Sequence, residues 1–324
     1  MKLFVTGGAG FIGSNFIHYI LEHYPQDEVV NYDILSYAGN LENLEKWEND
    51  PRYLFVHGDI CDKTKVIQSI KGSDVVVHFA AESHVDRSIT DSSAFVRTNV
   101  LGTQTLLDAV KELHIARFHH VSTDEVFGSL KRGDAAFDEN TPYYPRSPYS
   151  ASKAGSDHLV RAYFETYGLP ITISNCSNNY GPYHYPEKLI PLTLSRIFER
   201  KKVPLYGNGD QIRDWLYVKD HCRALDMILR KGRIGETYCI GGDNQPTNKE
   251  IVLFILKYFG LNEEYIEYVT DRPGHDFRYD MKYEKINRQL GWKPLVSLEE
   301  GLTETIEWFK ENKRWLENIR KKLV

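Results

Sequence analysis

Short apolar runs alternate with stretches of helical periodicity over the first 175 residues of the chain. The apolar runs predict strands over residues 2–6, 28–32, 53–57, 74–79, 118–122 and 171–175. The stretches between them predict helices over residues 11–24, 63–70, 93–113 and 149–167. Such alternation is typical of an α/β fold in which helices cover both faces of a parallel sheet, a doubly wound arrangement.

The pattern is looser after residue 175, where loops separate shorter elements. It predicts helices over residues 189–200, 218–230 and 248–259, strands over residues 203–206 and 236–240, and two closing helices. We therefore expect a first domain over residues 1–175 and a smaller α/β lobe over residues 176–324 that is interleaved with it. The chain carries no repeat, low-complexity segment or linker-like stretch.

Composition narrows the classes of function. The 324 residues include 40 basic and 45 acidic side chains, a mild balance that favours neither nucleic acid nor a membrane surface as a partner. No apolar run reaches the length of a membrane span, and the N-terminus begins with a strand rather than a signal peptide. The cysteines are Cys61, Cys176, Cys222 and Cys239. Because they lie far apart without a C-x-x-C pair, they indicate a reduced, cytoplasmic protein rather than a disulfide scaffold or a metal site.

A glycine-rich segment follows the first predicted strand and opens a predicted helix. Gly8, Gly10 and Gly13 fit the spacing G-x-G-x-x-G, and Gly7 gives the alternative G-x-x-G-x-x-G. Such glycines let the backbone approach a pyrophosphate at a helix N-terminus. Asp33 stands 20 residues after Gly13. An acid there accepts ribose hydroxyls and repels a 2′-phosphate, so NAD is favoured over NADP. The alternative is a glycine turn that binds no ligand.

We expect the cofactor contacts to come from this loop, from the ends of the next strands and from the helix near residue 149. The residues are Gly7, Gly10, Phe11, Ile12, Gly13, Asp33, Asp59, Ile60, Ala80, Ala81, Tyr149 and Lys153. Asp59 follows the third predicted strand and could reach the adenine. The small side chains of Ala80 and Ala81 leave room for the cofactor.

Two adjacent acids, Asp124 and Glu125, follow the strand predicted over residues 118–122. Open α/β sheets bind ligands at the carboxyl ends of their strands. Two carboxyl groups at such an end can share acid–base catalysis, one giving a proton and the other taking one. A turn with a helix N-cap is the alternative explanation. Tyr149 and Lys153 lie one helical turn apart and share a face. We therefore expect the ammonium to stabilise a phenolate and to lower the pKa of the tyrosine.

Residues 6–13, Asp33, Thr123 and the Tyr149/Lys153 pair together resemble an extended short-chain dehydrogenase/reductase. Within that superfamily, residues 122–128, 176–182, 186–191, 213–218 and 271–276 resemble the dTDP-glucose 4,6-dehydratases. The likeness runs from residue 2 to about residue 310 and implies a Rossmann-type sheet with a substrate-binding C-terminal lobe. Related epimerases and decarboxylases resemble it at the glycine loop and at the tyrosine and lysine, but lack the acid pair in this form.

The resemblance implies the dehydration of dTDP-glucose, with NAD as a tightly bound hydride carrier. Tyr149 would take the proton of the sugar 4-hydroxyl, and Thr123 would help to hold that oxygen. Glu125 would remove the C5 proton, and Asp124, kept protonated, would donate to the departing C6 hydroxyl. The implied product is dTDP-4-dehydro-6-deoxyglucose, a precursor of deoxysugars such as rhamnose.

The resemblance also implies a set of substrate contacts. They are Ser83, Thr123, Asn178, Lys188, Leu189, Pro204, Tyr206, Arg213, Asn248, Arg272 and His275. Arg213 and Arg272 would pair with the diphosphate, and Tyr206 would stack on the base. The alternative for each arginine is a surface ion pair with a neighbouring aspartate. The helices over residues 93–113 and from residue 149 match those that pair subunits in the superfamily, which implies a homodimer. Phe127 stands where the family commonly has tyrosine.

Two other classes of function stay open. One is a different nucleotide-sugar enzyme on the same scaffold, namely a UDP-glucose 4,6-dehydratase, a 4-epimerase or a decarboxylase. The other is a non-catalytic protein that senses NAD. Asp124 counts against the epimerase, the decarboxylase and the sensor, because none of them needs a proton donor at C6.

Overall fold

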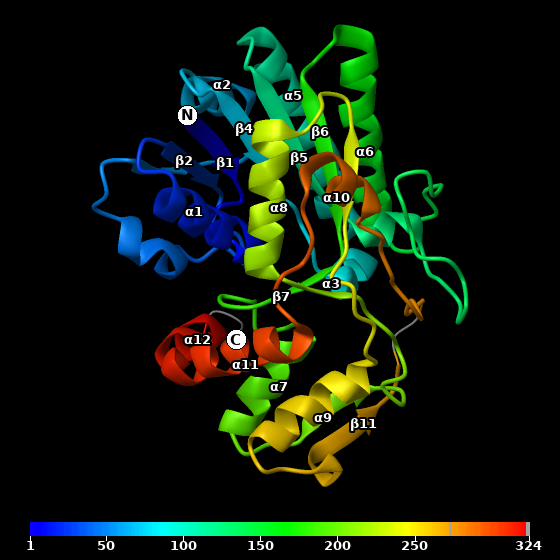
Figure 1. Ribbon diagram of the computed structural model, residues 1–324. Coiled ribbons are helices and arrows are strands. Elements are labelled where there is room, and N and C mark those ends of the chain that lie inside the picture. Colours follow the sequence, from blue (N-terminus) through cyan, green and yellow to red (C-terminus); the bar gives the residue numbers. More distant parts are fainter. Residues whose placement is uncertain (272–273, 322–324) are drawn as a thin grey trace.

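A seven-stranded parallel sheet forms the upper part of the molecule in the computed structural model, which describes residues 1–271 and 274–321 (Figure 1). Its strands run in the order β10-β6-β5-β4-β1-β2-β3, which confirms the expected doubly wound α/β fold. Their bounds are β1 Lys2–Thr6, β2 Glu28–Asp33, β3 Tyr53–His57, β4 Val75–His78, β5 Arg117–Thr123, β6 Ile171–Cys176 and β10 Thr237–Ile240. The order reverses beside β1, so the carboxyl ends of β1 and β4 mark the switch point at which open α/β sheets bind ligands.

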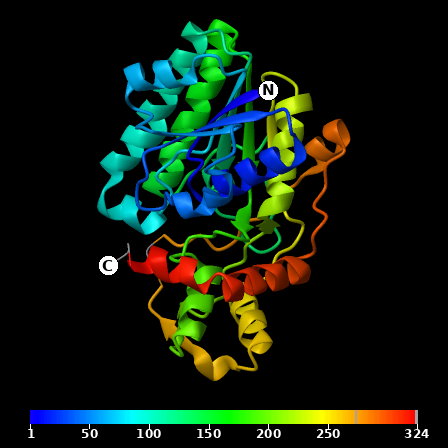
Figure 2. The ribbon, with the colours of Figure 1, turned by 90° about the vertical axis from the view of Figure 1, so that its left-hand side faces the viewer.

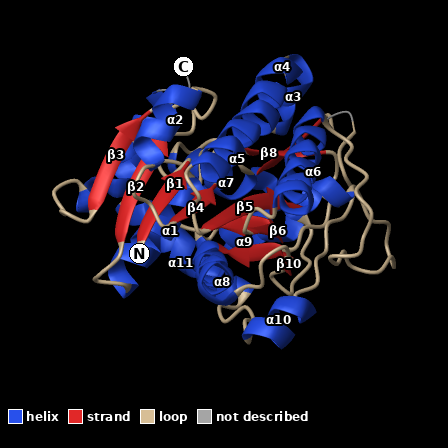
Figure 3. Ribbon diagram, turned by 90° about the horizontal axis from the view of Figure 1, so that it is seen from above, coloured by secondary structure: helices blue, strands red, loops and turns tan. Residues whose placement is uncertain are grey.

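Helices cover both faces of the sheet (Figure 3). One face carries α1 (Phe11–His23), α8 (Val218–Lys231) and α10 (Glu284–Leu290), and the other carries α2 (Lys63–Ile70), α5 (Thr103–Glu112) and α6 (Pro148–Tyr167). The alternation along β1 explains this division, because Leu3 and Val5 pack into the first core and Phe4 into the second. Both faces are therefore apolar, as a buried parallel sheet requires.

The helix predicted over residues 93–113 is more complex than its periodicity indicates. It consists of α4 (Ser92–Phe95), a π-helical stretch, η2 (Val96–Gly102), and α5. At Gly102 the helix passes so close to Ile60 that a Cβ would lie 2.4 Å from its Cδ1. The short helix α3 (Val85–Thr90) precedes it and was not predicted, since six mostly polar residues carry no readable period.

Below the sheet lies a second group of elements, which we call the C-terminal lobe (Figures 1 and 2). It contains α7 (Leu189–Phe198), α9 (Asn248–Tyr258), α11 (Leu298–Glu311), α12 (Lys313–Lys321) and the parallel pair β8 (Val203–Tyr206) and β11 (Ile266–Val269). A second parallel pair, β7 (Asn178–Tyr180) and β9 (Trp215–Tyr217), lies where the lobe meets the sheet. Three short 3₁₀ helices, η1 (Leu41–Trp47), η3 (Asp124–Phe127) and η4 (Glu263–Tyr265), complete the described elements.

The two halves of the sequence exchange elements. β10 extends the sheet beside β6, with Thr237 opposite Ile173, and α8 packs on α1. In the other direction, the Trp315 indole of α12 donates to the Asn43 amide oxygen at 2.8 Å. The division at residue 175 stays a prediction. The two predicted closing helices are α11 and α12, and α10 before them was not predicted. None of the helices in the described ranges is long and apolar enough to cross a membrane.

Candidate active site

A cavity of about 740 Å³ lies between the carboxyl edge of the sheet and the C-terminal lobe. Its volume is typical of a pocket that encloses a small-molecule ligand. Every residue predicted to contact cofactor or substrate, or to carry the chemistry, lines this cavity, apart from Arg272. Arg272 lies outside the described residues. The fold thus brings together side chains from both halves of the sequence, while their individual roles stay predictions.

The glycine loop is shaped for close approach by a ligand. Gly7 has a φ of +71°, and a Cβ there would lie 2.6 Å from the Ala80 nitrogen. A Cβ on Gly13 would lie 2.3 Å from the Gly7 oxygen. Gly10 caps α1 without a side-chain hydrogen bond, and the first helical turn holds no acid. The helix therefore presents free N–H groups and its positive dipole end to the cavity, which fits the pyrophosphate of a dinucleotide.

Asp33 ends β2 beside this loop and is buried. Its Oδ2 accepts a hydrogen bond from the Ala9 N–H at 3.0 Å, and its Oδ1 accepts one from Leu35 at 2.8 Å. Burial raises the pKa of Asp33, and these two hydrogen bonds oppose the rise. Asp59 also lines the cavity, but its carboxylate pairs with Arg97 at 3.0 Å. Arg97 was not predicted as part of the site.

We expect Gly13→Ala to weaken NAD binding by about 10- to 100-fold, because the new methyl group must displace the Gly7 carbonyl. The dissociation constant of NAD, measured by calorimetry, checks this. Gly155→Ala on α6 is a matched control, since its Cβ would meet Val100 at an ordinary 3.5 Å. Equal NAD affinity in the two variants would contradict the proposed fit of the loop.

The two acids follow β5 in the short helix η3. Thr123 caps η3 by accepting a hydrogen bond from the Glu125 N–H at 3.3 Å, so the expected alternative of a turn with an N-cap is present as well. Thr123 also donates to Asp124 Oδ1 at 3.1 Å. Asp124 is 2% exposed, and its Oδ2 has no hydrogen-bond partner within the described residues. Burial, followed by the charge of Glu125, raises the pKa of Asp124 well above its usual value. This shift favours the protonated form of Asp124, which is the form that can donate a proton.

Tyr149 and Lys153 lie in the first turns of α6. Ser147 caps this helix through a capping box with Ser150, and Pro148 occupies its first position. The expected lowering of the Tyr149 pKa is not found. Burial, followed by the negative charge of Glu125, raises the pKa of Tyr149 well above its usual value. Lys153 is itself buried and donates from Nζ to the Val121 oxygen at 2.9 Å.

Arg213 also lines the cavity and is 5% exposed. The alternative of a surface ion pair with Asp214 is wrong. The Asp214 carboxylate instead accepts hydrogen bonds from the backbone of Gly242 and Asn244. The Arg213 guanidinium lies 4.3 Å from the ring of Tyr279, and among the described residues it pairs with no carboxylate. Its positive charge is thus available to an anionic ligand.

The far end of the cavity is built from the C-terminal lobe. Lys188 and Leu189 stand at the start of α7, Pro204 and Tyr206 in β8, and Asn248 at the start of α9. The exposed ring of Tyr206 meets His275 edge-on at 6.1 Å. His275 Nδ1 lies 2.6 Å from Asp271 Oδ1. Nearer the sheet, Asn178 Oδ1 is buried without a partner in the described ranges, so it can accept from a ligand.

Some residues of the site were missed from the sequence. Tyr279 supports Arg213 from far along the chain, and His84 lies 3.4 Å from Glu187 at the cavity wall. No local spacing indicates these contacts. Asp157, which contacts the site from behind, is different, because it follows Lys153 by one helical turn and could have been found by extending the Tyr-x-x-x-Lys pattern.

Residues 4–305 match the family described as GDP-mannose 4,6-dehydratase. A dTDP-glucose 4,6-dehydratase from Shigella flexneri is 51% identical over 99% of this chain and 96% of its own. The crystal structure of a dTDP-glucose 4,6-dehydratase from Streptomyces venezuelae with NAD bound is 48% identical and superposes with a TM-score of 0.96, covering 98% of this chain and all of that one. A UDP-glucose 4-epimerase from Thermotoga maritima is 29% identical, with a TM-score of 0.89 over 97% of this chain and 100% of that chain.

Proposed function

The chain belongs to the GDP-mannose 4,6-dehydratase family, and from that premise we propose that Asp124, Glu125 and Tyr149 share the proton transfers of its reaction. The reaction of this chain is the 4,6-dehydration of dTDP-glucose. This hydro-lyase activity uses NAD and gives dTDP-4-dehydro-6-deoxyglucose and water. One observation supports the assignment of roles above the others. Asp124 is a buried acid whose pKa is raised well above its usual value, and its Oδ2 has no partner among the described residues beside a second carboxyl group, an arrangement that an epimerase does not need.

NAD fits the glycine loop, the uncapped start of α1 and Asp33, and when bound it supplies a hydride acceptor for C4 and a hydride donor for C6. The protein supplies the proton transfers. Tyr149 takes the proton of the 4-hydroxyl, and Thr123 holds the same oxygen. The ammonium of Lys153, one helical turn away, offsets part of the rise in the Tyr149 pKa that burial and Glu125 cause. Once C4 is a ketone, the C5 hydrogen is acidic enough for a carboxylate to remove.

The elimination step then uses the two acids in order. Glu125 removes the C5 proton, and Asp124 gives its proton to the C6 hydroxyl, so that water leaves with the electron pair of the C6–O bond. When C6 then receives a hydride, the proton held by Glu125 returns to C5. A donor is needed here because hydroxide is a poor leaving group, and general acid catalysis of this kind contributes about 10²- to 10⁴-fold. The burial that keeps Asp124 neutral therefore also makes it reactive.

Product analysis tests this function. The protein is incubated with dTDP-glucose, UDP-glucose and GDP-mannose in separate reactions, and the alkali-induced absorbance of a 4-keto sugar is recorded. We expect the strongest signal from dTDP-glucose. A sugar nucleotide inverted at C4 and no keto sugar would favour the epimerase, and no change with any of the three would overturn the dehydratase.

Arg213 is expected to bind the diphosphate of the substrate. We expect Arg213→Lys to raise the KM for dTDP-glucose by about tenfold with a smaller change in kcat, because an ammonium cannot reproduce two parallel hydrogen bonds. Arg223→Lys on α8 is the matched control, since Arg223 pairs with Asp220 and does not line the cavity. Steady-state kinetics separate the two variants, and an unchanged KM for Arg213→Lys would contradict its role.

We further infer a cytoplasmic homodimer. Ile89, Val96 and Leu101 are large apolar side chains that are exposed. Val96 and Leu101 lie in η2, within the first of the two helices that the superfamily uses to pair subunits, and Ile89 lies just before it in α3. The four cysteines are all free, which suits a reducing compartment. Light scattering measures the mass directly, and a monomer at micromolar concentration would contradict the dimer.

A further inference from the structure

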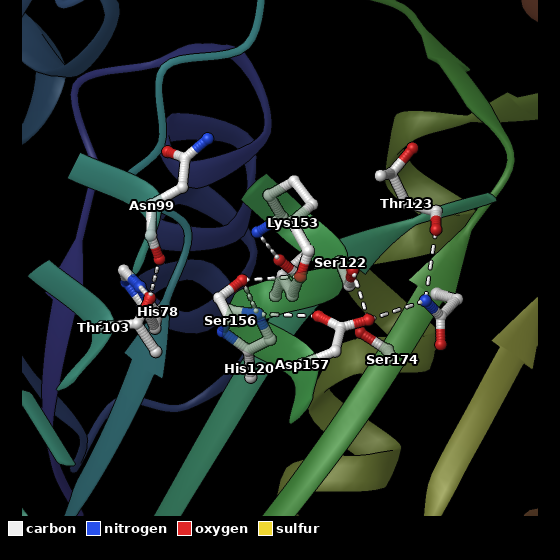
Figure 4. A network of polar contacts seen from close by, with 12 residues as sticks. His78, Asn99, Thr103, His120, Ser122, Thr123, Lys153, Ser156, Asp157 and Ser174 are labelled. Carbon is white, nitrogen blue, oxygen red and sulfur yellow. Dashed lines mark hydrogen bonds and ion pairs between the residues drawn. The ribbon is translucent and has the colours of Figure 1, made fainter. Parts of the chain in front are cut away.

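Asp157 lies behind the candidate active site on α6 and is completely buried, with 0% exposure. The hydroxyls of Ser122 and Tyr143 each donate to its Oδ2 at 2.8 Å, and the Asn175 amide donates to the same oxygen at 3.3 Å. His120 Nε2 lies 3.0 Å from its Oδ1 (Figure 4). One carboxylate thus contacts β5, β6 and the loop before α6. The reaction proposed above uses none of these contacts directly.

The contacts of Asp157 continue to the end of β5. Asn175 donates to the Thr123 oxygen at 3.1 Å as well as to Asp157, and Lys153 donates to the Val121 oxygen. Since Asp157 itself accepts from Ser122, three consecutive residues of β5 are held from α6 and β6. The next two residues along the chain are the acid pair. Because the acid pair follows these three residues directly, the network also constrains where the pair lies relative to α6. Figure 4 shows Ser122 and Thr123 at this end of the strand, with Lys153 and Asp157 nearby.

The network also contains a buried charge. Burial alone would favour neutral Asp157, but the contact with His120 and the charge of Lys153 hold the pKa of Asp157 below its ordinary value. Burial, followed by the charge of Lys153, lowers the pKa of His120 to about 4, so the imidazole is neutral at neutral pH. The ionised carboxylate must then be balanced by the buried ammonium, because an uncompensated charge in this position is costly.

We propose that Asp157 is a positioning residue for the dehydration, which fixes the end of β5 against α6 and supplies the counter-charge that keeps Lys153 ionised beside Tyr149. This role rests on the functions proposed above for Lys153 and Tyr149. It is a role in geometry and charge, because Asp157 does not line the cavity.

The other described titratable groups around Lys153 carry no negative charge at neutral pH, so Asp157 is the group that balances its ammonium. His78 on β4 and His120 on β5 have pKa values lowered by burial, so both are neutral at neutral pH. Burial raises the pKa of Cys176 on β6 to about 12, so the thiol is neutral as well. Burial lowers the pKa of Lys153, and Asp157 opposes that fall. Removing the carboxylate should therefore let Lys153 lose its proton at a lower pH.

The first test replaces Asp157 with asparagine, which has nearly the same shape and no charge. We expect kcat for dTDP-glucose to fall about 10²-fold with KM little changed, since the lost interaction acts on the transition state. We also expect the alkaline limb of the kcat profile to move to lower pH, because activity is lost as pH rises through the pKa of Lys153. Asp226→Asn is the matched control. Asp226 is also buried, accepts from Tyr24 at 2.5 Å and pairs with Arg230, but these partners are not part of the network around Asp157 and Lys153.

A second measurement does not depend on turnover. NMR of the holoprotein labelled with 15N-lysine gives the pKa of Lys153 directly, with Lys153→Met identifying its signal. A lower Lys153 pKa in Asp157→Asn supports the role, and an unchanged pKa with unchanged kcat overturns it while leaving the dehydratase intact. A wild-type protein that makes no 4-keto product overturns the proposed function whatever the pKa of Lys153.

If Asp157→Asn does not fold, Tyr143→Phe tests the role of Asp157 instead. The tyrosine is half-buried, and its hydroxyl, which also accepts from Arg161, helps to keep Asp157 ionised. Its removal should raise the pKa of Asp157 and move the acidic limb of the kcat profile to higher pH. An acidic limb in the wild-type position would overturn the role of Asp157.

Discussion

Replacing Asp124 with asparagine is expected to slow the elimination of water by about 10²- to 10³-fold while leaving oxidation at C4 in place. The amide keeps the shape of the side chain but has no acidic proton for the C6 hydroxyl. Rapid-mixing absorbance of the holoenzyme should show reduced nicotinamide accumulating without the 4-keto-6-deoxy product. Asp134→Asn, in an exposed loop, controls for the loss of one carboxyl group. Turnover at the wild-type rate would contradict the role of Asp124.

The same variant is expected to unfold at a higher temperature near neutral pH. The folded-state pKa of Asp124 is raised, so the free energy of unfolding falls as pH rises from the unfolded-state pKa towards the folded-state one. An asparagine amide at position 124 does not ionise, so the free energy of unfolding of the variant does not fall in this way as pH rises. Calorimetry at several pH values measures it, and the gain should shrink in acid, where the wild-type carboxyl group is neutral in both states.

Replacing Tyr149 with phenylalanine is expected to stop the reaction one stage earlier. Without the phenol no group takes the 4-hydroxyl proton, so kcat should fall about 10³-fold and reduced nicotinamide should not accumulate. The ring stays in place against Phe95, so NAD content and substrate affinity should change little. Tyr163→Phe on the same helix is the control, because Tyr163 donates to Asp108 and does not line the cavity.

The contrast between the two variants is itself informative. Asp124→Asn should stop after the redox step and Tyr149→Phe before it. Accumulation of reduced nicotinamide in Tyr149→Phe would mean that another group deprotonates the sugar. Tyr149 would then contribute only to binding the cofactor.

Much of the fold could be predicted because buried parallel strands and amphipathic helices have strong periods. β1 and β3 and the helix α2 match their predicted bounds, and α1 differs by one residue. The elements that were missed are short and depend on partners far away. β7 pairs with β9 over three residues, and β11 is specified mainly by its contact with β8. The sequence of either segment alone therefore does not indicate its strand, because the pairing partner lies elsewhere in the chain.

The site divides in the same way. Glycine spacing and the acid pair are local patterns, so Gly13 and Asp124 could be found from the sequence. The pKa of Tyr149 could not, because it depends on how deeply the ring is buried and on Glu125 approaching from another element. Arg213 illustrates a second limit, since its neighbour Asp214 suggested an ion pair but turns towards the loop at Gly242.

β10 comes from the second half of the sequence but completes the sheet formed by the first half, and this affects folding during translation. β6 is buried on both sides of its backbone in the finished sheet, yet its partner β10 emerges from the ribosome only after α7, β8, β9 and α8. During that interval the unpaired backbone N–H and C=O groups along the edge of β6 are open to pairing with other chains. We therefore expect nascent chains that end before residue 237 to bind chaperones and to aggregate when released, and the sheet to close only when the final strand arrives.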